Sequence, residues 1–340
     1  MAEPSGSGAA RRAMPWGDLP RGEFPGSGLL VVDKDAGVTS HDVVAAVRRL
    51  AGTRKAGHAG TLDPMATGVL CVGVGRATKL LRYVAGADKE YTATVRLGVE
   101  TSTEDADGRV TAARGAAGVR VEAVDRAIAA LTGVVEQVPS SVSAVKVGGR
   151  RAHELVRRGV DVRLPARPVR ISAFEREGGL AVSRAGGDAG PVTVADVRVR
   201  VVCGAGTYVR ALARDLGAAL GTGAHLTALR RTRVGMWTES RATTIAGVAR
   251  LLLAGGGVPL APLAEVCAAL FPRVDVSDDE AEDLASGRFI AMREWGQAPP
   301  ESGEEPVAAA WGSRGPVALV CERGGRLKPD LLLALGEDAP

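Results

Sequence analysis

The stretch GHAGTLDPMATGVL, residues 57–70, places a single carboxylate, Asp63, inside a glycine-rich segment. Pro64 fixes its own φ and biases Asp63 toward an extended backbone, so the carboxylate points in a defined direction. Asp followed by Pro is also typical of a helix start, with Asp63 as the N-cap and Pro64 at the first helical position. The stretch therefore predicts either an acidic loop of fixed shape or an ordinary helix cap.

Regular elements are predicted on both sides of this stretch. Residues 28–34 (GLLVVDK) have the pattern of a buried strand, and the run that begins at Ser40 has helical apolar spacing and a natural stop at Gly52. Residues 69–74 predict a second strand directly after the acidic segment. Asp63 is thus expected between elements of a packed core.

The rest of the chain alternates strands and helices without a regular βα order. Strands are predicted at 91–97, 168–174 and 192–203, and helices at 121–132 and 207–220. Residues 178–190 are rich in glycine and are expected to form a surface insertion. Short strands near Ala308, at 317–321 and at 331–335 predict a small β-rich domain at the end. This order favours an α+β domain over a mostly antiparallel sheet, followed by that small domain.

Arg210 lies near the start of the predicted helix 207–220 and shares one stripe of it with Arg214. The N-terminal end of a helix carries partial positive charge, so an arginine there is poorly placed for the helix dipole. We therefore expect Arg210 to have an acidic partner elsewhere in the chain.

Composition narrows the functional classes. The first 25 residues are rich in Gly, Pro, Ser and Arg without an apolar centre, and no apolar run approaches a membrane span. We expect residues 1–25 to be a disordered extension of a cytoplasmic protein. The four cysteines are far apart and predict buried free thiols, and the four histidines form no zinc pattern, so no metal is expected. The GVG sequence at 73–75 meets neither nucleotide-binding pattern, and no cofactor is predicted.

Charge is distributed unevenly. From Phe271 to the end there are 7 basic and 14 acidic residues of the 43 and 39 in the chain, so this tail carries −7 and the part before it +11. Residues 140–170 hold eight Lys or Arg against two acids and predict an exposed basic segment able to follow a phosphate backbone. A basic body favours a polyanionic partner. Codon bias toward arginine and a simply solvated charged face are the alternatives, since 37 of the basic residues are Arg.

Several motifs occur together in a fixed order. Besides residues 57–68, these are DK at 33–34 with GVTS at 37–40, RATK at 76–79, KEY at 89–91, residues 98–108, QVPS at 137–140 with SAVK at 143–146, GTYVR at 206–210, and GAHL at 223–226 with LRR at 229–231. Over residues 28–235 the chain resembles bacterial tRNA pseudouridine-55 synthases of the TruB family. The family usually has Lys-Pro where this chain has Lys34-Asp35, which we expect to alter the turn that supports the cleft.

The resemblance implies a pseudouridine-synthase fold with a mixed, mostly antiparallel sheet at 26–250, and a small PUA-like, β-rich domain at 270–340. It implies isomerisation of the uridine at position 55 in the tRNA T loop, by a cytoplasmic monomer without cofactor, metal, membrane or obligatory protein partner. The basic segment 140–170 would be an insertion that grips the T arm. The acidic charge of the tail matches phosphate poorly, so we expect it to contribute little to affinity.

The resemblance also implies roles for individual residues. Asp63 would be the nucleophile and Arg210 its ion-pair partner, which favours the charged form of the carboxylate. Tyr91 would pack on the target uracil and His58 would help to hold the tRNA loop with its base flipped out. Leu229 would line the base pocket, with Tyr208 beside it.

Two other functions stay open on the sequence. One is a tRNA-binding folding helper whose catalysis is incidental or lost. The other is a guide-dependent relative that modifies ribosomal RNA. Attack at the sugar carbon and attack at the base carbon are equally compatible with these residues.

Overall fold

We analysed a computed structural model of the chain. The structure describes residues 14–141, 143, 146–147, 149–152, 155, 158, 160, 162, 164–187, 190–295 and 305–333. Much of the predicted basic segment 140–170, and residues 1–13 of the predicted extension, lie outside the described residues.

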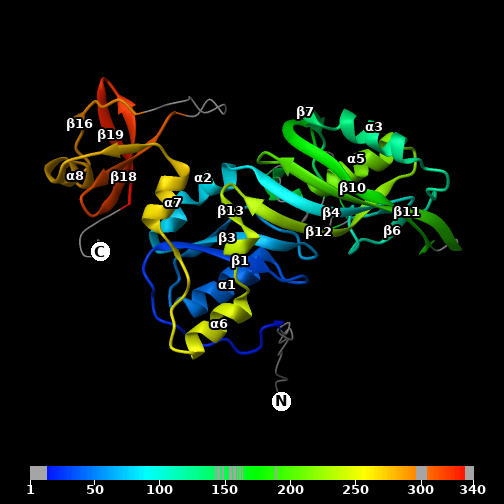
Figure 1. Cartoon of the computed structure of the whole chain (residues 1–340), viewed down its shortest axis with the longest axis horizontal. Helices are drawn as coiled ribbons and strands as arrows, with labels where there is room; N and C mark the ends of the chain where they lie inside the picture. Colours follow the sequence, from blue (N-terminus) through cyan, green and yellow to red (C-terminus); the bar gives the residue numbers. More distant parts are fainter. Residues whose placement is uncertain are drawn as a thin grey trace, which may run out of the picture.

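A ten-stranded sheet forms the larger part of the molecule (Figure 1). Eight strands follow the order β14-β1-β3-β12-β4-β11-β10-β7, while β2 pairs with β3 and β13 with β12. Their bounds are β1 Gly28–Lys34, β2 Ala56–Ala59, β3 Thr67–Val74, β4 Lys89–Leu97, β7 Gly133–Gln137, β10 Arg167–Gly187, β11 Gly190–Cys203, β12 Ala224–Val234, β13 Trp237–Thr238 and β14 Ala261–Pro262. Among these pairs only β3 with β12 is parallel, so the predicted mixed, mostly antiparallel sheet is confirmed.

Helices and short elements complete this part. They are α1 Ser40–Leu50, η1 Gly75–Leu80, α2 Leu81–Gly86, α3 Val121–Ala130, α5 Val209–Ala219, η2 Glu239–Arg241, α6 Ile245–Leu253 and α7 Leu263–Leu270, with the strand pairs β5 Glu100–Thr101 and β6 Val110–Ala112, and β8 Lys146–Val147 and β9 Arg150–Arg151. Helices α1 and α6 lie together near β1, and α3 and α5 lie at the other end of the sheet (Figure 1). Helix α1 begins at the predicted place because Thr39 and Asp42 form a capping box.

A five-stranded sheet follows at the C-terminal end. It has the order β15-β17-β18-β19-β16 and packs against α8, as Figure 1 shows in orange and red. The bounds are β15 Arg273–Asp275, α8 Asp278–Ala285, β16 Ile290–Ala291, β17 Ala308–Gly312, β18 Gly315–Arg323 and β19 Arg326–Leu332. The last strand begins earlier than the sequence pattern predicted.

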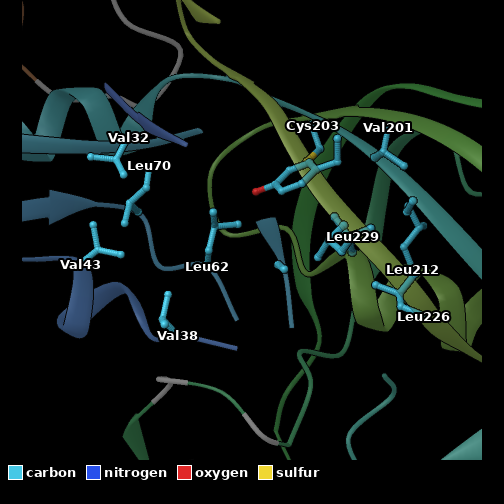
Figure 2. Packing of buried hydrophobic residues seen from close by; sticks show 14 of the residues in the cluster. Val32, Val38, Val43, Leu62, Leu70, Val201, Cys203, Leu212, Leu226 and Leu229 are labelled. Atoms are coloured by element: carbon cyan, nitrogen blue, oxygen red, sulfur yellow. The ribbon is translucent and has the colours of Figure 1, made fainter. Parts of the chain in front are cut away.

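Two apolar clusters position the site. The first runs through the ten-stranded sheet, and Figure 2 shows Leu62 between Val38 and Val43 on one side and Leu226 and Leu229 on the other. The second joins residues of β1 and β3 to residues of β18, so the two sheets share buried surface. Leu62, directly before Asp63, is 3% exposed, which makes it the apolar anchor of the acidic segment.

Two expectations differ from the structure. Residues 178–187, expected as part of a surface insertion between two strands, instead continue β10 and pair with β11, with a register shift between Glu177 and Leu180 at the glycines. Residues 14–25 are not disordered. Trp16 packs against the first cluster and donates a hydrogen bond from Nε1 to Asp35 Oδ2 at 2.7 Å. The aspartate that replaces the family's usual proline thus binds this segment.

Within the described residues, no helix has both the length and the apolar content to cross a membrane.

Candidate active site

Asp63 lies in the connection between the paired strands β2 and β3. Hydrogen bonds to the segment at the start of α1 fix the backbone on both sides of Asp63. The amide of Leu62 donates to Ser40 Oγ at 2.9 Å, and Gly37 N–H donates to the carbonyl of Pro64 at 2.7 Å. No helix begins at Pro64, since a turn leads into β3 at Thr67. The helix-cap alternative is therefore wrong, and Asp63 is an acid on a braced loop with its side chain 33% exposed.

Arg210 makes a two-pronged ion pair with this carboxylate. Its Nε and Nη2 donate to Asp63 Oδ2 and Oδ1 at 2.9 and 3.0 Å. The guanidinium side chain is only 4% exposed and also donates from Nη1 to the carbonyl of Thr103 and to Ser140 Oγ. Asp63 is thus the acidic partner expected for Arg210. Bidentate geometry in a mostly buried site fixes the direction of the carboxylate.

Asp105 is a second carboxylate beside Arg210. Its Oδ2 lies 3.6 Å from Arg210 Nε, and its side chain is 7% exposed. Burial raises the pKa of Asp105, while the hydrogen bond from Thr103 and the charge of Arg210 act in the opposite direction. Two carboxylates therefore share one buried arginine, and Asp63 is the one that reaches the surface.

Lys34 holds the loop from the side of β1. This residue is 1% exposed, and its Nζ donates to the carbonyls of Asp35, Val38 and Pro64 at 2.9, 2.8 and 3.2 Å. Burial lowers the pKa of Lys34 to about 8, and the charge of Asp63 opposes this shift. Three carbonyl acceptors match the three donors of an ammonium group, so the charged form fits this pocket.

Tyr91 and Leu229 lie on the neighbouring strands β4 and β12 and belong to the same apolar cluster as Leu62. Tyr91 is 7% exposed, and burial raises the pKa of its hydroxyl, with the adjacent Arg231 opposing. Arg231 is itself buried and donates to the carbonyls of Val69 and Gly60 at 2.7 and 3.1 Å. An aromatic ring and an aliphatic side chain are thus fixed on adjacent strands of the sheet.

Tyr208 and His58 lie at the edges of this arrangement. Tyr208 is the N-cap of α5, and Gln137 holds its backbone by two hydrogen bonds, of 2.9 Å to the N–H and 3.2 Å to the carbonyl. His58 lies on β2 with its ring edge against His41, at 5.4 Å between centroids. Burial lowers the pKa of His58, and its electrostatic interactions with His41 and Arg231 act in the same direction. Among the described residues, its buried Nδ1 has no hydrogen-bond partner.

Four residues around Asp63 received no individual role from the sequence: Lys34, Asp105, Ser140 and Arg231. Each occurs in a motif of the ordered set, but none has a distinctive spacing. A lysine at the end of an apolar strand was a usable signal, since a buried cation needs acceptors.

A cavity of about 640 Å³ lies elsewhere. It lies between the N-terminal segment at Phe24, the start of α7 and the C-terminal sheet, and none of the residues discussed above line it. We assign the site to Asp63 because charge and hydrogen bonding converge there.

Comparisons with known proteins identify the family of the chain. Residues 48–209 match the TruB family pseudouridylate synthase N-terminal domain, residues 210–256 the tRNA pseudouridylate synthase B C-terminal domain, and residues 271–332 the C-terminal domain of tRNA pseudouridine synthase II. The chain is 50% identical to tRNA pseudouridine synthase B of Arthrobacter sp. (strain FB24) over 92% of this chain and 99% of that one. The chain belongs to the TruB family. Its members include tRNA pseudouridine synthase B of Mycobacterium leprae (strain TN), 49% identical over 91% of each chain.

Solved structures agree on the TruB fold. A Cbf5-Nop10-Gar1 complex contains a chain that matches with a TM-score of 0.67 and 24% identity, over 92% of this chain and 87% of that one. An H/ACA RNP bound to a substrate RNA containing 2'-deoxyuridine matches with a TM-score of 0.66 and 23% identity, over the same shares. The predicted pseudouridine-synthase fold is confirmed, and as a TruB member the protein is a pseudouridine synthase, an isomerase.

Proposed function

We propose that the protein converts the uridine at position 55 in the tRNA T loop to pseudouridine, with Asp63 as the nucleophile. The observation that carries this proposal is the ion pair between Asp63 and the buried Arg210. A carboxylate that is oriented by a buried arginine and is still 33% exposed is available for attack on a bound nucleotide. The tRNA substrate follows from the names of the relatives.

The reaction needs few chemical groups. The bond between N1 of the base and C1' of the ribose breaks, a bond from C5 to C1' forms, the proton on C5 leaves and N1 gains a proton. No electrons are transferred to or from the substrate. Asp63 would attack either the sugar carbon or the base carbon, and both routes use the same residue.

A uracil stacked inside a tRNA loop cannot reach Asp63, so it must be flipped out. We assign Tyr91 and Leu229 to the walls that receive the base, since both lie in the apolar cluster that also contains Leu62, the residue before Asp63. His58 and Tyr208, at the edges, would contact the loop from which the base is taken. The basic part of the chain before Phe271 would bind the tRNA backbone. The protein would act in the cytoplasm, as a monomer and without a protein partner.

The test is tritium release from a tRNA transcript labelled at uridine C5, with the parent and Asp63→Asn. We expect near-stoichiometric release by the parent and none by Asp63→Asn, which keeps the shape but is a poor nucleophile. Asp125→Asn is the matched control, because Asp125 is an exposed acid on α3 that pairs with Arg176. Tight tRNA binding by the parent without release would instead favour the folding helper. Release only in the presence of a guide RNA would favour the guide-dependent relative.

A further inference from the structure

Two arginines of α5, one helical turn apart, contact the same two segments of the chain. We name these the acidic turn, residues 101–108, and the β7 exit, residues 137–141. Arg210 donates to Thr103 O in the acidic turn at 2.8 Å and to Ser140 Oγ in the β7 exit at 3.0 Å. The ion pair with Asp63 therefore depends on where both segments lie.

Arg214 also connects the acidic turn with the β7 exit, but it takes no part in the ion pair with Asp63. Its Nη1 donates to Glu104 Oε1 at 2.7 Å and its Nη2 to the carbonyl of Val138 at 2.8 Å, while Nε donates to Asp215 at 2.9 Å. A guanidinium is planar and rigid, so these bonds set the spacing between the acidic turn and the β7 exit. The side chain of Arg214 is 31% exposed, but two carboxylates contact it, which makes it a poor phosphate ligand.

Glu104 is held in an unfavourable state. Its φ is +63°, and it is the only residue other than glycine with a positive φ in the described part of the chain. Its side chain is 15% exposed, and its buried Oε2 has no hydrogen-bond partner among the described residues. The left-handed backbone and the unsatisfied oxygen both cost stability. Strain of this kind persists only where surrounding contacts impose it.

The strained backbone has a geometric effect. The carbonyl of Thr103 accepts from Arg210, and the next carbonyl, of Glu104, accepts from Leu226 N–H on β12 at 3.0 Å. The left-handed conformation of Glu104 thus allows two successive carbonyls to accept hydrogen bonds, one from Arg210 and the other from strand β12. The bond from Arg214 to the Glu104 side chain holds this turn in place.

We infer that Arg214 and Glu104 form a clamp that positions Arg210, and through it Asp63, for the isomerisation. Neither residue is assigned a contact with the reacting atoms, so both are positioning residues. The inference rests on the proposed role of Asp63.

The first experiment compares the parent, Arg214→Ala and the control Arg176→Ala, which removes a bidentate ion pair between α3 and β10 that touches neither segment. Single-turnover tritium release at saturating enzyme gives the rate, and filter binding gives the tRNA Kd. We expect Arg214→Ala to be about tenfold to a hundredfold slower, because small displacements of a reacting group cost that much. We expect its Kd to stay within about twofold, and Arg176→Ala to match the parent.

The second experiment separates positioning from folding. Asn tolerates a positive φ and carries no charge, so Glu104→Asn should unfold at or above the parent's Tm while its rate falls about tenfold or more. Arg214→Ala combined with Glu104→Asn should recover Tm relative to Arg214→Ala and remain as slow. A parental rate in Glu104→Asn, rates that follow Tm across the set, or a loss confined to Kd would each overturn the clamp. An active Asp63→Asn would overturn the proposed nucleophile instead.

Discussion

Two cations of different chemistry hold the Asp63 loop. Arg210 binds the carboxylate itself through two parallel hydrogen bonds, whereas Lys34 binds carbonyls, including that of Pro64. Burial lowers the pKa of Lys34 to about 8, so this lysine loses its charge in the alkaline range. One of the two cations that hold the loop therefore titrates as the pH rises.

This titration predicts a pH dependence of stability. Between pH 8 and 10.5 the folded chain has released the Lys34 proton while the unfolded chain keeps it, so the unfolded state binds more protons and stability from this group rises with pH. Relative to Lys34→Met, the parent should gain about 3 kcal/mol in unfolding free energy across this window. Urea denaturation of both proteins at a series of pH values measures the difference. A difference that stays constant with pH would contradict the assigned pKa.

The elements around the site are held by contacts between segments. Helix α5 presents Arg210 in its first turn, against the helix dipole, and Gln137 at the end of β7 fixes the backbone of the N-cap Tyr208. The Gln137 side chain is 2% exposed, and both of its amide hydrogen bonds are partly buried. The edge strand of the sheet thereby sets where α5 begins and where Arg210 points.

We predict that Gln137→Ala lowers the unfolding free energy by about 1–3 kcal/mol, because the Tyr208 N–H loses its partner in a partly buried place. Its isomerisation rate should fall as well, since the start of α5 is released. Thr244→Ala is the control: Thr244 caps α6 through the amide of Gly247, so its loss costs about 1 kcal/mol away from the site. Thermal unfolding and single-turnover rates of both variants test this. Equal rates in the two variants would show that α5 needs no such anchor.

The two sheets are packed together as one body. Leu319 of β18 is fully buried in a cluster with Leu29 and Cys71 of the larger sheet, and Arg76 Nη1 donates to the carbonyl of Leu333 at 2.9 Å. Lys79 and Arg82 add polar contacts to β19. The small β-rich domain expected at the end of the chain is thus joined to the larger part by buried surface.

We predict that Leu319→Ala lowers the unfolding free energy by about 2–5 kcal/mol and shifts the melting of both sheets together. Val320 points to the other face of β18, into the cluster under α8, and Val320→Ala serves as the matched control. Hydrogen exchange resolved by segment measures which strands lose protection. If Leu319→Ala destabilised only the strands after residue 271, the two sheets would be energetically independent.

The sequence by itself determined the local elements and the family. Alternating apolar residues, caps and glycines predicted β1, α1, β3, β4 and α5 near their observed bounds, because those signals depend only on neighbours in the chain. The ordered motifs predicted the fold and singled out Asp63 and Arg210, which the structure pairs, but they gave no individual role to Lys34 or Asp105. A local pattern also misled, since glycines at 178–190 resembled a loop but are accommodated within the hairpin of β10 and β11.

Tertiary structure decided which of these residues meet. Asp63 and Arg210 are 147 positions apart, and only the sheet that brings the β2–β3 connection to the start of α5 pairs them. The same packing buries Lys34 and Asp105 and so shifts their pKa values, and it imposes the left-handed backbone of Glu104. Ion pairs and burial depend on distances across the fold, and spacing along the chain carries no record of those distances.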